Sequence, residues 1–220
     1  MNIILNIIMA MKRMMLALLL VLTIASSCRA QKSVIDAADI IDLFRFRPSI
    51  AVGDNEESEA QELVDHAAKS FIARGFTQGL TGDGYGGPCV IIDGFYKGGT
   101  VNEQIYAFEP GNDLDQACVV EMSACNDGDA SDYQLYMTVE LFSSRAAGMF
   151  LHQFSQLGFT ITEMPADDEH CTLSNGTIFV DYALEKGYAN ECHYFIIQTA
   201  ERHAAIEPPC DEDEKDYQEN

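Results

Sequence analysis

Apolar positions follow a helical period in three segments of this chain and alternate with polar positions in most of the others. The first helical segment, 33–45, places its apolar residues on one face: Val34, Ala37, Ile41 and Phe44. This spacing predicts a short amphipathic helix. We expect it to end before Pro48, because proline lacks the backbone donor that a helix needs.

Two later helices are predicted to end alike. The first has an acidic start at 53–62 and a glycine, Gly75, at the C-cap position. The second is capped by Ser143 or Ser144 and ends at Gly158. Glycine at a helix end and serine at a helix start are common capping residues. The apolar faces contain Leu63, Ala67 and Phe71 in one helix, and Ala146, Phe150 and Phe154 in the other.

Beyond each of these helices, runs rich in Val, Ile, Tyr and Phe alternate with polar residues between Gly, Asn and Asp. Such runs predict β-strands, and short connections make successive strands antiparallel. The expected strands are 76–80, 89–96, 103–109, 116–124, 133–142, 159–163, 177–185 and 191–199. The chain is therefore predicted to be an α+β protein. Its two helices pack on one face of an antiparallel sheet, or two such sheets lie face to face.

Two pairs of similar segments predict an internal duplication. FIARGFT at 71–77 returns as FSQLGFT at 154–160, and DGFYKGGTVNEQIY at 93–106 returns as DYALEKGYANECHY at 181–194. Both pairs keep their order along the chain, which predicts two tandem helix-plus-meander units. The polar residues that the second pair shares are Asp93/Asp181, Asn102/Asn190 and Glu103/Glu191. We interpret the Asn-Glu pairs as hairpin tips rather than ligand contacts.

The expected organisation follows from these patterns. The segments are a leader at 1–30, an N-terminal helix and linker at 31–48, a first α+β repeat at 49–125, a second at 126–200, and an acidic disordered tail at 201–220. Since the repeated residues are mainly core and turn residues, activity is expected where the two copies differ.

The leader has the features of an export signal. Lys12 and Arg13 precede an apolar run at 14–25 that is too short to span a bilayer, and Met11 is the predicted start. We therefore expect an extracytoplasmic protein, in the bacterial periplasm, membrane-anchored or secreted.

The end of the leader has competing interpretations. Cys28 follows Ala25, Ser26 and Ser27, and this segment resembles the lipobox of bacterial lipoproteins, which implies lipid attachment at Cys28. Alternatively, signal peptidase cuts after Ala30, or the leader stays as an uncleaved anchor. We favour the lipoprotein.

The acidic composition restricts the partners. Removal of residues 1–28, which hold Lys12 and Arg13 but no Asp or Glu, changes the net charge from −22 to about −24. A surface of this sign repels phosphate, so nucleic acid is excluded and membrane contact is expected only through the lipid anchor. Basic proteins and cations remain candidates, although solubility alone accounts for the charge.

Cysteine count adds a disulfide expectation. Six cysteines follow residue 28: Cys89, Cys118, Cys125, Cys171, Cys192 and Cys210. An even number in an exported chain permits three disulfides with many connectivities. A bond between Cys118 and Cys125 is excluded if ACVVEMSAC is one strand, because the two side chains then lie far apart on opposite faces.

Three patterns suggest cofactors or metals, but their contexts argue against each. GDGYGG at 82–87, with Glu103 downstream, precedes a strand rather than the helix that a dinucleotide site needs. NDGDASD at 126–132 lacks the glycine and closing glutamate of a calcium loop. His170-Cys171 and Cys192-His193 lack zinc-ligand spacing. We expect no cofactor and no metal, and NGT at 175–177 is interpreted as a turn.

Function is less constrained than fold. No HExxH, GxSxG or P-loop occurs, and no Ser, His or Asp is singled out as a nucleophile or base. The leading hypothesis is an exported, non-enzymatic protein that binds a protein, peptide or small ligand through its sheet or the junction of its halves. The alternative is an extracytoplasmic hydrolase without a recognisable motif.

Overall fold

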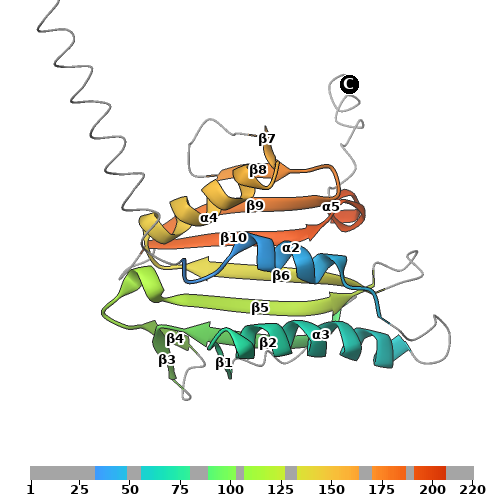
Figure 1. The fold of residues 1–220 in the computed structure, drawn as a ribbon, viewed down its shortest axis with the longest axis horizontal. Coiled ribbons are helices and arrows are strands. Elements are labelled where there is room, and N and C mark those ends of the chain that lie inside the picture. Colours follow the sequence, from blue (N-terminus) through green and yellow to red (C-terminus); the bar gives the residue numbers. More distant parts are fainter. Residues whose placement is uncertain are drawn as a thin grey trace, which may run out of the picture. The chain divides into compact units, whose positions relative to one another are not determined.

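An eight-stranded antiparallel sheet dominates the structure (Figure 1). The computed structural model describes residues 33–48, 56–79, 89–102, 107–126, 133–163, 170–186 and 191–206. From Val34 onward they belong to one compact unit. The strand order is β1-β2-β5-β6-β10-β9-β8-β7, and a separate two-stranded hairpin joins β3 to β4. The α+β prediction is confirmed, in the version with one sheet.

The helices are α2 (Ala37–Arg45), α3 (Glu56–Ala73), α4 (Ser144–Gln156) and α5 (Ala200–Ile206), with a 3-10 turn at Leu114–Gln116. The first strands are β1 (Thr77–Gln78), β2 (Cys89–Lys97), β3 (Gly99–Asn102), β4 (Ala107–Pro110), β5 (Cys118–Cys125) and β6 (Gln134–Leu141). The remaining strands are β7 (Thr160–Glu163), β8 (His170–Ser174), β9 (Ile178–Lys186) and β10 (Glu191–Thr199).

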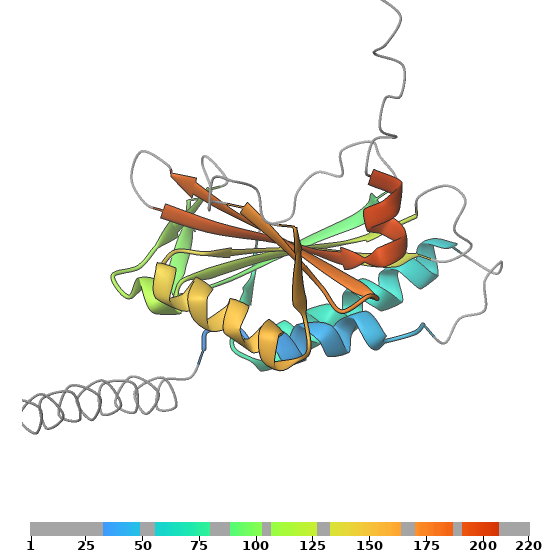
Figure 2. The same ribbon diagram turned by 90° about the horizontal axis from the view of Figure 1, so that it is seen from above.

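Helices cover the two faces of the sheet unequally. Helices α2, α3 and α4 lie along one face, and the short α5 lies on the other (Figure 2). The core is between the three helices and the sheet, where a cross-strand row of Phe95, Val120, Val139 and Phe195 is fully buried. Burial of large apolar side chains is the main stabilising contribution to such a layer.

Helices α3 and α4 end in the same hydrogen-bonded turn. The N–H of Phe76 donates to the carbonyl of Phe71 (3.1 Å), and the N–H of Phe159 donates to that of Phe154 (3.1 Å). The intervening glycines have positive φ, 80° at Gly75 and 87° at Gly158. These are Schellman motifs, and in each the two Phe rings pack edge to face. The predicted glycine stops are confirmed.

Alanine substitutions at Gly158, in the turn after α4, and at Gly148, inside α4, should have opposite effects on stability. Gly158→Ala should destabilise the protein by about 1–2 kcal/mol, the cost of a left-handed backbone for a residue with a Cβ. Gly148→Ala, inside α4, should stabilise it by roughly 0.5–1 kcal/mol through higher helix propensity. A new Cβ meets no atom within 4 Å at either site. Urea unfolding followed by circular dichroism measures both, and equal signs would contradict this interpretation of the turn.

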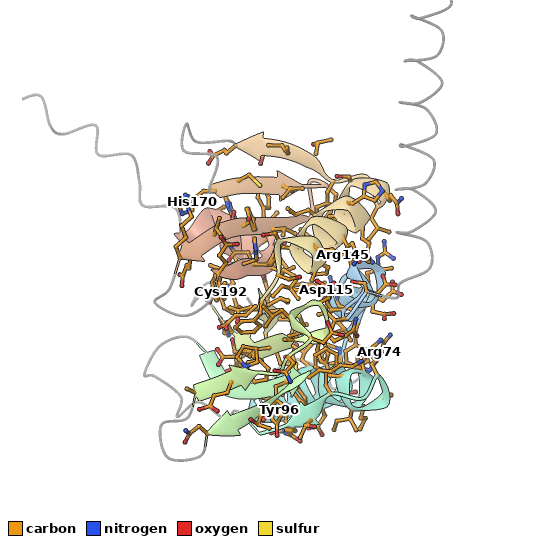
Figure 3. The ribbon with its side chains drawn as sticks, turned by 90° about the vertical axis from the view of Figure 1, so that its left-hand side faces the viewer. Arg74, Tyr96, Asp115, Arg145, His170 and Cys192 are labelled. Carbon is orange, nitrogen blue, oxygen red and sulfur yellow. The ribbon has the colours of Figure 1, made fainter. Side chains whose placement is uncertain are left out.

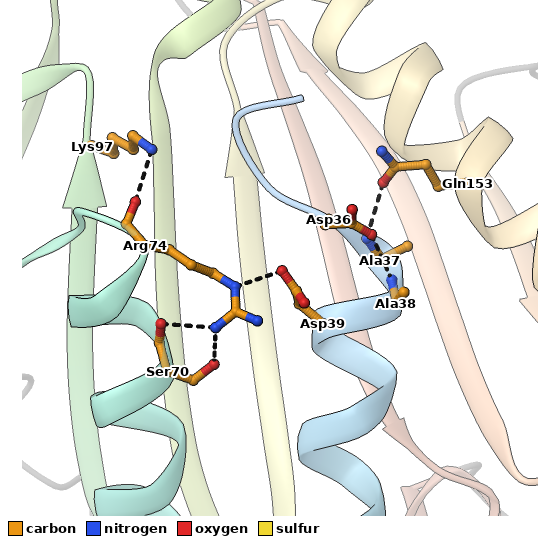
Figure 4. A network of polar contacts seen from close by, with 8 residues as sticks. All are labelled: Asp36, Ala37, Ala38, Asp39, Ser70, Arg74, Lys97 and Gln153. Atoms are coloured by element: carbon orange, nitrogen blue, oxygen red, sulfur yellow. Dashed lines mark hydrogen bonds and ion pairs between the residues drawn. The ribbon is translucent and has the colours of Figure 1, made fainter. Parts of the chain in front are cut away.

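Helix α2 lies between α3 and α4 and contacts both (Figure 4). The guanidinium of Arg74, after α3, forms an ion pair with Asp39 of α2. On the other side, Gln153 of α4 accepts a hydrogen bond from the N–H of Ala37 (2.9 Å). The predicted N-terminal helix is thus confirmed, and its polar residues connect the two longer helices.

The structure corrects three predicted segments. The strand expected at 103–109 is replaced by the β3/β4 hairpin, which lies outside the main sheet, with residues 103–106 outside the described part. Residues 170–174, which lie between the expected strands 159–163 and 177–185, form β8, so four strands of the main sheet follow α4. The tail expected at 201–220 begins with helix α5, because its side chains pack on the sheet.

The second sequence match, between 93–106 and 181–194, does not place its shared Asp residues at equivalent positions in the structure. Asp93 lies on β2 in line with buried Phe95, facing the helices, whereas Asp181 lies on β9 and faces the other way. In addition, β2 is the second main-sheet strand after its helix and β9 is the third. Strand β8 is the physical reason, because it lies between β7 and β9 in the sheet and makes β9 one strand more distant from α4 along the chain than β2 is from α3. Asn190, Glu103 and Tyr106 lie outside the described residues.

Three of the cysteines that the structure describes do not take part in disulfides. Cys118, Cys171 and Cys192 are free thiols. Cys89 and Cys125 are cross-strand partners of β2 and β5, and such partners have a Cα separation of about 4.5–5.5 Å, within the disulfide range. We expect a Cys89–Cys125 bond to form under oxidising conditions. Peptide mapping without reductant should recover this linked pair, and its absence from oxidised protein would contradict the expectation.

Candidate functional site

The sheet face opposite α2, α3 and α4 is the candidate site, and we call it the open face. His170 and Cys192 lie on this side of the sheet, and Arg74 and Arg145 lie on the helix side (Figure 3). Two cross-strand rows define the open face: Val119, Glu140, Tyr194, Ala183 and His170 in one, and Glu121, Thr138, Ile196, Asp181 and Thr172 in the other. Strand alternation brings these residues together from five strands.

Helix α5 covers one end of the open face. The guanidinium carbon of Arg202 lies 4.9 Å from the centre of the Tyr136 ring, and the His203 ring stacks on Phe179 at 4.0 Å. His203 also approaches a carboxylate oxygen of Asp181 at 3.7 Å. These contacts hold the helix against β6 and β9.

The β3/β4 hairpin bounds the opposite end. Its Phe108 ring lies 5.9 Å from the ring of Tyr96 on β2 and 5.2 Å from that of Phe142, just beyond β6. Aromatic pairs at these distances contribute roughly 0.5–1.5 kcal/mol beyond the area that they bury. Among the residues that the structure describes, the hairpin and α5 therefore leave the middle of the sheet uncovered between them.

Two carboxylates without cationic partners stand in this uncovered middle. Glu121 on β5 and Glu140 on β6 are on neighbouring strands, and neither forms an ion pair among the described residues. Desolvation raises the pKa of both carboxyl groups, and the negative charge of Glu121 raises that of Glu140 further. The folded protein therefore carries these two charges at a cost in stability.

Neighbouring groups on this face remain protonated at neutral pH. Desolvation raises the pKa of the Tyr194 hydroxyl to about 12. It also raises the pKa of the Cys192 thiol to about 12, aided by the charge of Glu140, whose carboxylate accepts a hydrogen bond from this thiol (3.8 Å). A thiol of this pKa is a poor nucleophile. Tyr194 and Cys192 are thus suited to contact a ligand rather than to attack it.

A cavity of about 290 Å³ opens over β8, β9 and β10. Its lining includes His170, Tyr194, Ile196 and Glu163. Asp181, at its floor, is held by hydrogen bonds from the Thr172 hydroxyl (2.8 Å) and the Gln198 amide (3.2 Å). Because these neutral donors occupy its oxygens, Asp181 is a structural carboxylate, and the cavity is suited to an apolar side chain.

A prediction tests whether the glutamates are a stability liability. The folded state raises the pKa of Glu140 above the ordinary 4.5, so the folded chain binds a proton at this carboxyl group more tightly than the unfolded chain does. The free energy of unfolding therefore falls as the pH rises above 4.5. Glu140→Gln should therefore raise the melting temperature at about pH 7, by roughly 2–4 °C if about 1 kcal/mol is recovered. The gain should vanish near pH 3, where the carboxyl group is protonated in both states. Calorimetry at both pH values measures it, and an equal gain at both would contradict the assigned cause.

The residue pairs considered as zinc ligands do not converge. His170 and Cys192 are on the open face, but Cys171 packs against the core and the Nδ1 atom of buried His193 lies 3.0 Å from the Tyr182 hydroxyl. No group of three or more possible metal ligands occurs within the described residues. The NGT turn is confirmed, since the Asn175 side chain accepts hydrogen bonds from the N–H of Thr177 (3.0 Å) and Ile178 (2.9 Å).

The other sequence predictions of sites fall outside the part of the chain that the structure describes. These are the leader with Cys28, the glycine-rich loop at 82–87, Glu103, and the acidic turn residues Asp127, Asp129 and Ser131. Of the described helices, none is long and apolar enough to cross a membrane.

Comparisons with protein-family models, curated proteins and solved structures found no match to this chain.

Proposed function

We propose that this chain is an exported binding protein, lipid-anchored through Cys28 or periplasmic, that binds a protein, peptide or small ligand on its open face. The observation that carries this proposal is the uneven cover of the sheet. Three helices bury one face, while the middle of the other leaves Tyr194, Ile196 and Glu121 accessible between α5 and the hairpin. Aromatic and apolar side chains beside charged ones are typical of interaction surfaces.

The energetics of the open face support a binding role. Two unpaired, desolvated carboxylates lower stability at neutral pH, and groups that oppose folding are frequent at functional sites. The three free thiols have raised pKa values, so none of them is an activated nucleophile. These features favour binding over the hydrolase alternative.

Photocrosslinking tests the proposed surface. The full chain, produced in its native cells, would carry benzoylphenylalanine at Ile196 or at His170, both on the open face. The control position is Ile72 of α3, which is 52% exposed on the helix side. We expect defined adducts from the open-face positions and none from position 72, with circular dichroism confirming that each variant folds. Adducts only from position 72, or from no position, would overturn the proposal.

The architecture also supports a tandem duplication, which we propose with a revised boundary. The main-sheet strands that follow α3 run in order from one edge to the centre, and those that follow α4 do so from the other edge. Phe71 and Phe154 stand at the same position of equivalent Schellman motifs. On this basis the units are 56–141 and 144–199, each a helix with four sheet strands, and the β3/β4 hairpin and α5 are additions that frame the open face.

A further inference from the structure

The charge of the open face restricts what can dock on it. Glu121 and Glu140 lie in its uncovered middle, and Glu185 follows on β9. Arg202 and His203 of α5 lie at the end of the face and contact Tyr136 and Asp181, respectively. Lys97 faces the helix side, where its ammonium donates to the carbonyl of Arg74 (3.0 Å). The middle of the open face therefore has negative charge that neither Arg202 nor Lys97 neutralises.

We propose that the open face binds an extended, basic segment of a partner protein, whose Lys or Arg side chains pair with Glu121 and Glu140. This inference rests on the proposed binding function and names the class of ligand. The ring of Tyr194 lies beside Glu140 in the same cross-strand row, and aromatic faces attract ammonium and guanidinium groups. The cavity that Tyr194 and Ile196 line accepts an apolar side chain next to the cation.

Other occupants of this face are disfavoured by charge. A second copy of the chain carries the same net charge of −22, and the chain's own segment 207–220 is strongly acidic. Either would bring negative charge against unpaired carboxylates, and like charges in contact are unfavourable. Nucleic acid and anionic lipid surfaces are disfavoured for the same reason. Of these classes, only a basic protein segment complements both the carboxylates and the apolar cavity.

Peptide binding to the full chain tests this inference. The probes are fluorescein-labelled peptides that alternate threonine with lysine, glutamine or glutamate, measured by fluorescence anisotropy at physiological salt. The variant Glu121→Gln/Glu140→Gln removes two charges from the open face. A matched control, Asp42→Asn/Asp65→Asn, removes two charges from exposed positions on α2 and α3. Both variants have the same net charge, so non-specific attraction affects them equally.

We expect the lysine peptide to bind more tightly than the other two peptides. The open-face variant should weaken this binding about tenfold, the loss typical of a charge-assisted hydrogen bond, and the control should leave it unchanged. Equal weakening in both variants, or no preference for lysine, would overturn the inference. If crosslinking at Ile196 still captures a neutral or acidic segment, the binding function stands and only the basic ligand is wrong. If crosslinking at Ile196 captures nothing, both the binding function and the basic ligand are wrong.

Discussion

Phe154→Ala should lower the free energy of unfolding by about 3–5 kcal/mol, the cost of deleting a fully buried aromatic ring. Phe154 is 0% exposed, and its ring packs on Phe150 (4.8 Å) and Phe159 (5.0 Å). Phe150 in turn contacts Phe195 of β10 (5.1 Å). Removing Phe154 therefore leaves a cavity where α4 meets both its own terminal turn and the sheet centre.

A neighbouring side chain is the matched control for this effect. Leu157→Ala removes an apolar side chain from the same helix end, but Leu157 is 42% exposed, so the change should stay within about 0.5 kcal/mol. Urea unfolding monitored by circular dichroism gives both values. Phe71→Ala should match Phe154→Ala, because Phe71 packs on Phe76 (5.4 Å) and Phe95 (5.5 Å) in the corresponding way. A loss at Phe154 no larger than at Leu157 would contradict the packing of this cluster.

The elements that sequence reasoning predicted well are those with strong local signals. Helix α4 begins after Ser143, whose hydroxyl accepts a hydrogen bond from the N–H of Ala146 (3.0 Å), and ends at Gly158. Strand β10 has the predicted bounds, 191–199. In each case, capping residues or alternating apolar residues within a few positions are enough to predict the element.

The missed elements depend on distant contacts. Strand β8 is short, follows the acidic sequence MPADDE at 164–169, and is stabilised by pairing with β7 and β9. Helix α5 has only seven residues, which is too few for a stable helix in isolation. Its packing on Tyr136 and Phe179 provides the stability that its own helix propensity does not. Neither signal is visible in a local window.

The candidate site was missed for a related reason. Glu121, Glu140 and Tyr194 come from three strands, and only the register of β5, β6 and β10 makes them neighbours. The sequence does contain a hint, since Glu121 interrupts the apolar run CVVEMSAC. A charged residue within a strand that is otherwise buried marks the face that the helices leave uncovered.

Gly98→Ala should be among the most damaging single changes, with a loss of roughly 3 kcal/mol or more from backbone strain and steric conflict together. Gly98 has a φ of 72°, and an added Cβ would lie 2.1 Å from the carbonyl oxygen of Gln116. That atom belongs to the backbone and cannot rotate away. The Gly98 carbonyl also accepts a hydrogen bond from the N–H of Gly111 (2.9 Å), which closes the base of the β3/β4 hairpin.

Gly75→Ala separates the two contributions to this loss, because Gly75 has a similar φ of 80° but no atom within 4 Å of a new Cβ. It should cost only about 1–2 kcal/mol, the backbone contribution, so thermal unfolding of both variants isolates the clash at Gly98.

Displacement of the hairpin by Gly98→Ala would also carry Phe108 away from Tyr96 and Phe142, which bound the open face. We therefore expect Gly98→Ala to weaken ligand capture at Ile196 even below its melting temperature, while Gly75→Ala leaves capture intact. Equal losses of stability in the two variants would show that the hairpin base tolerates a side chain and does not fix that end of the open face.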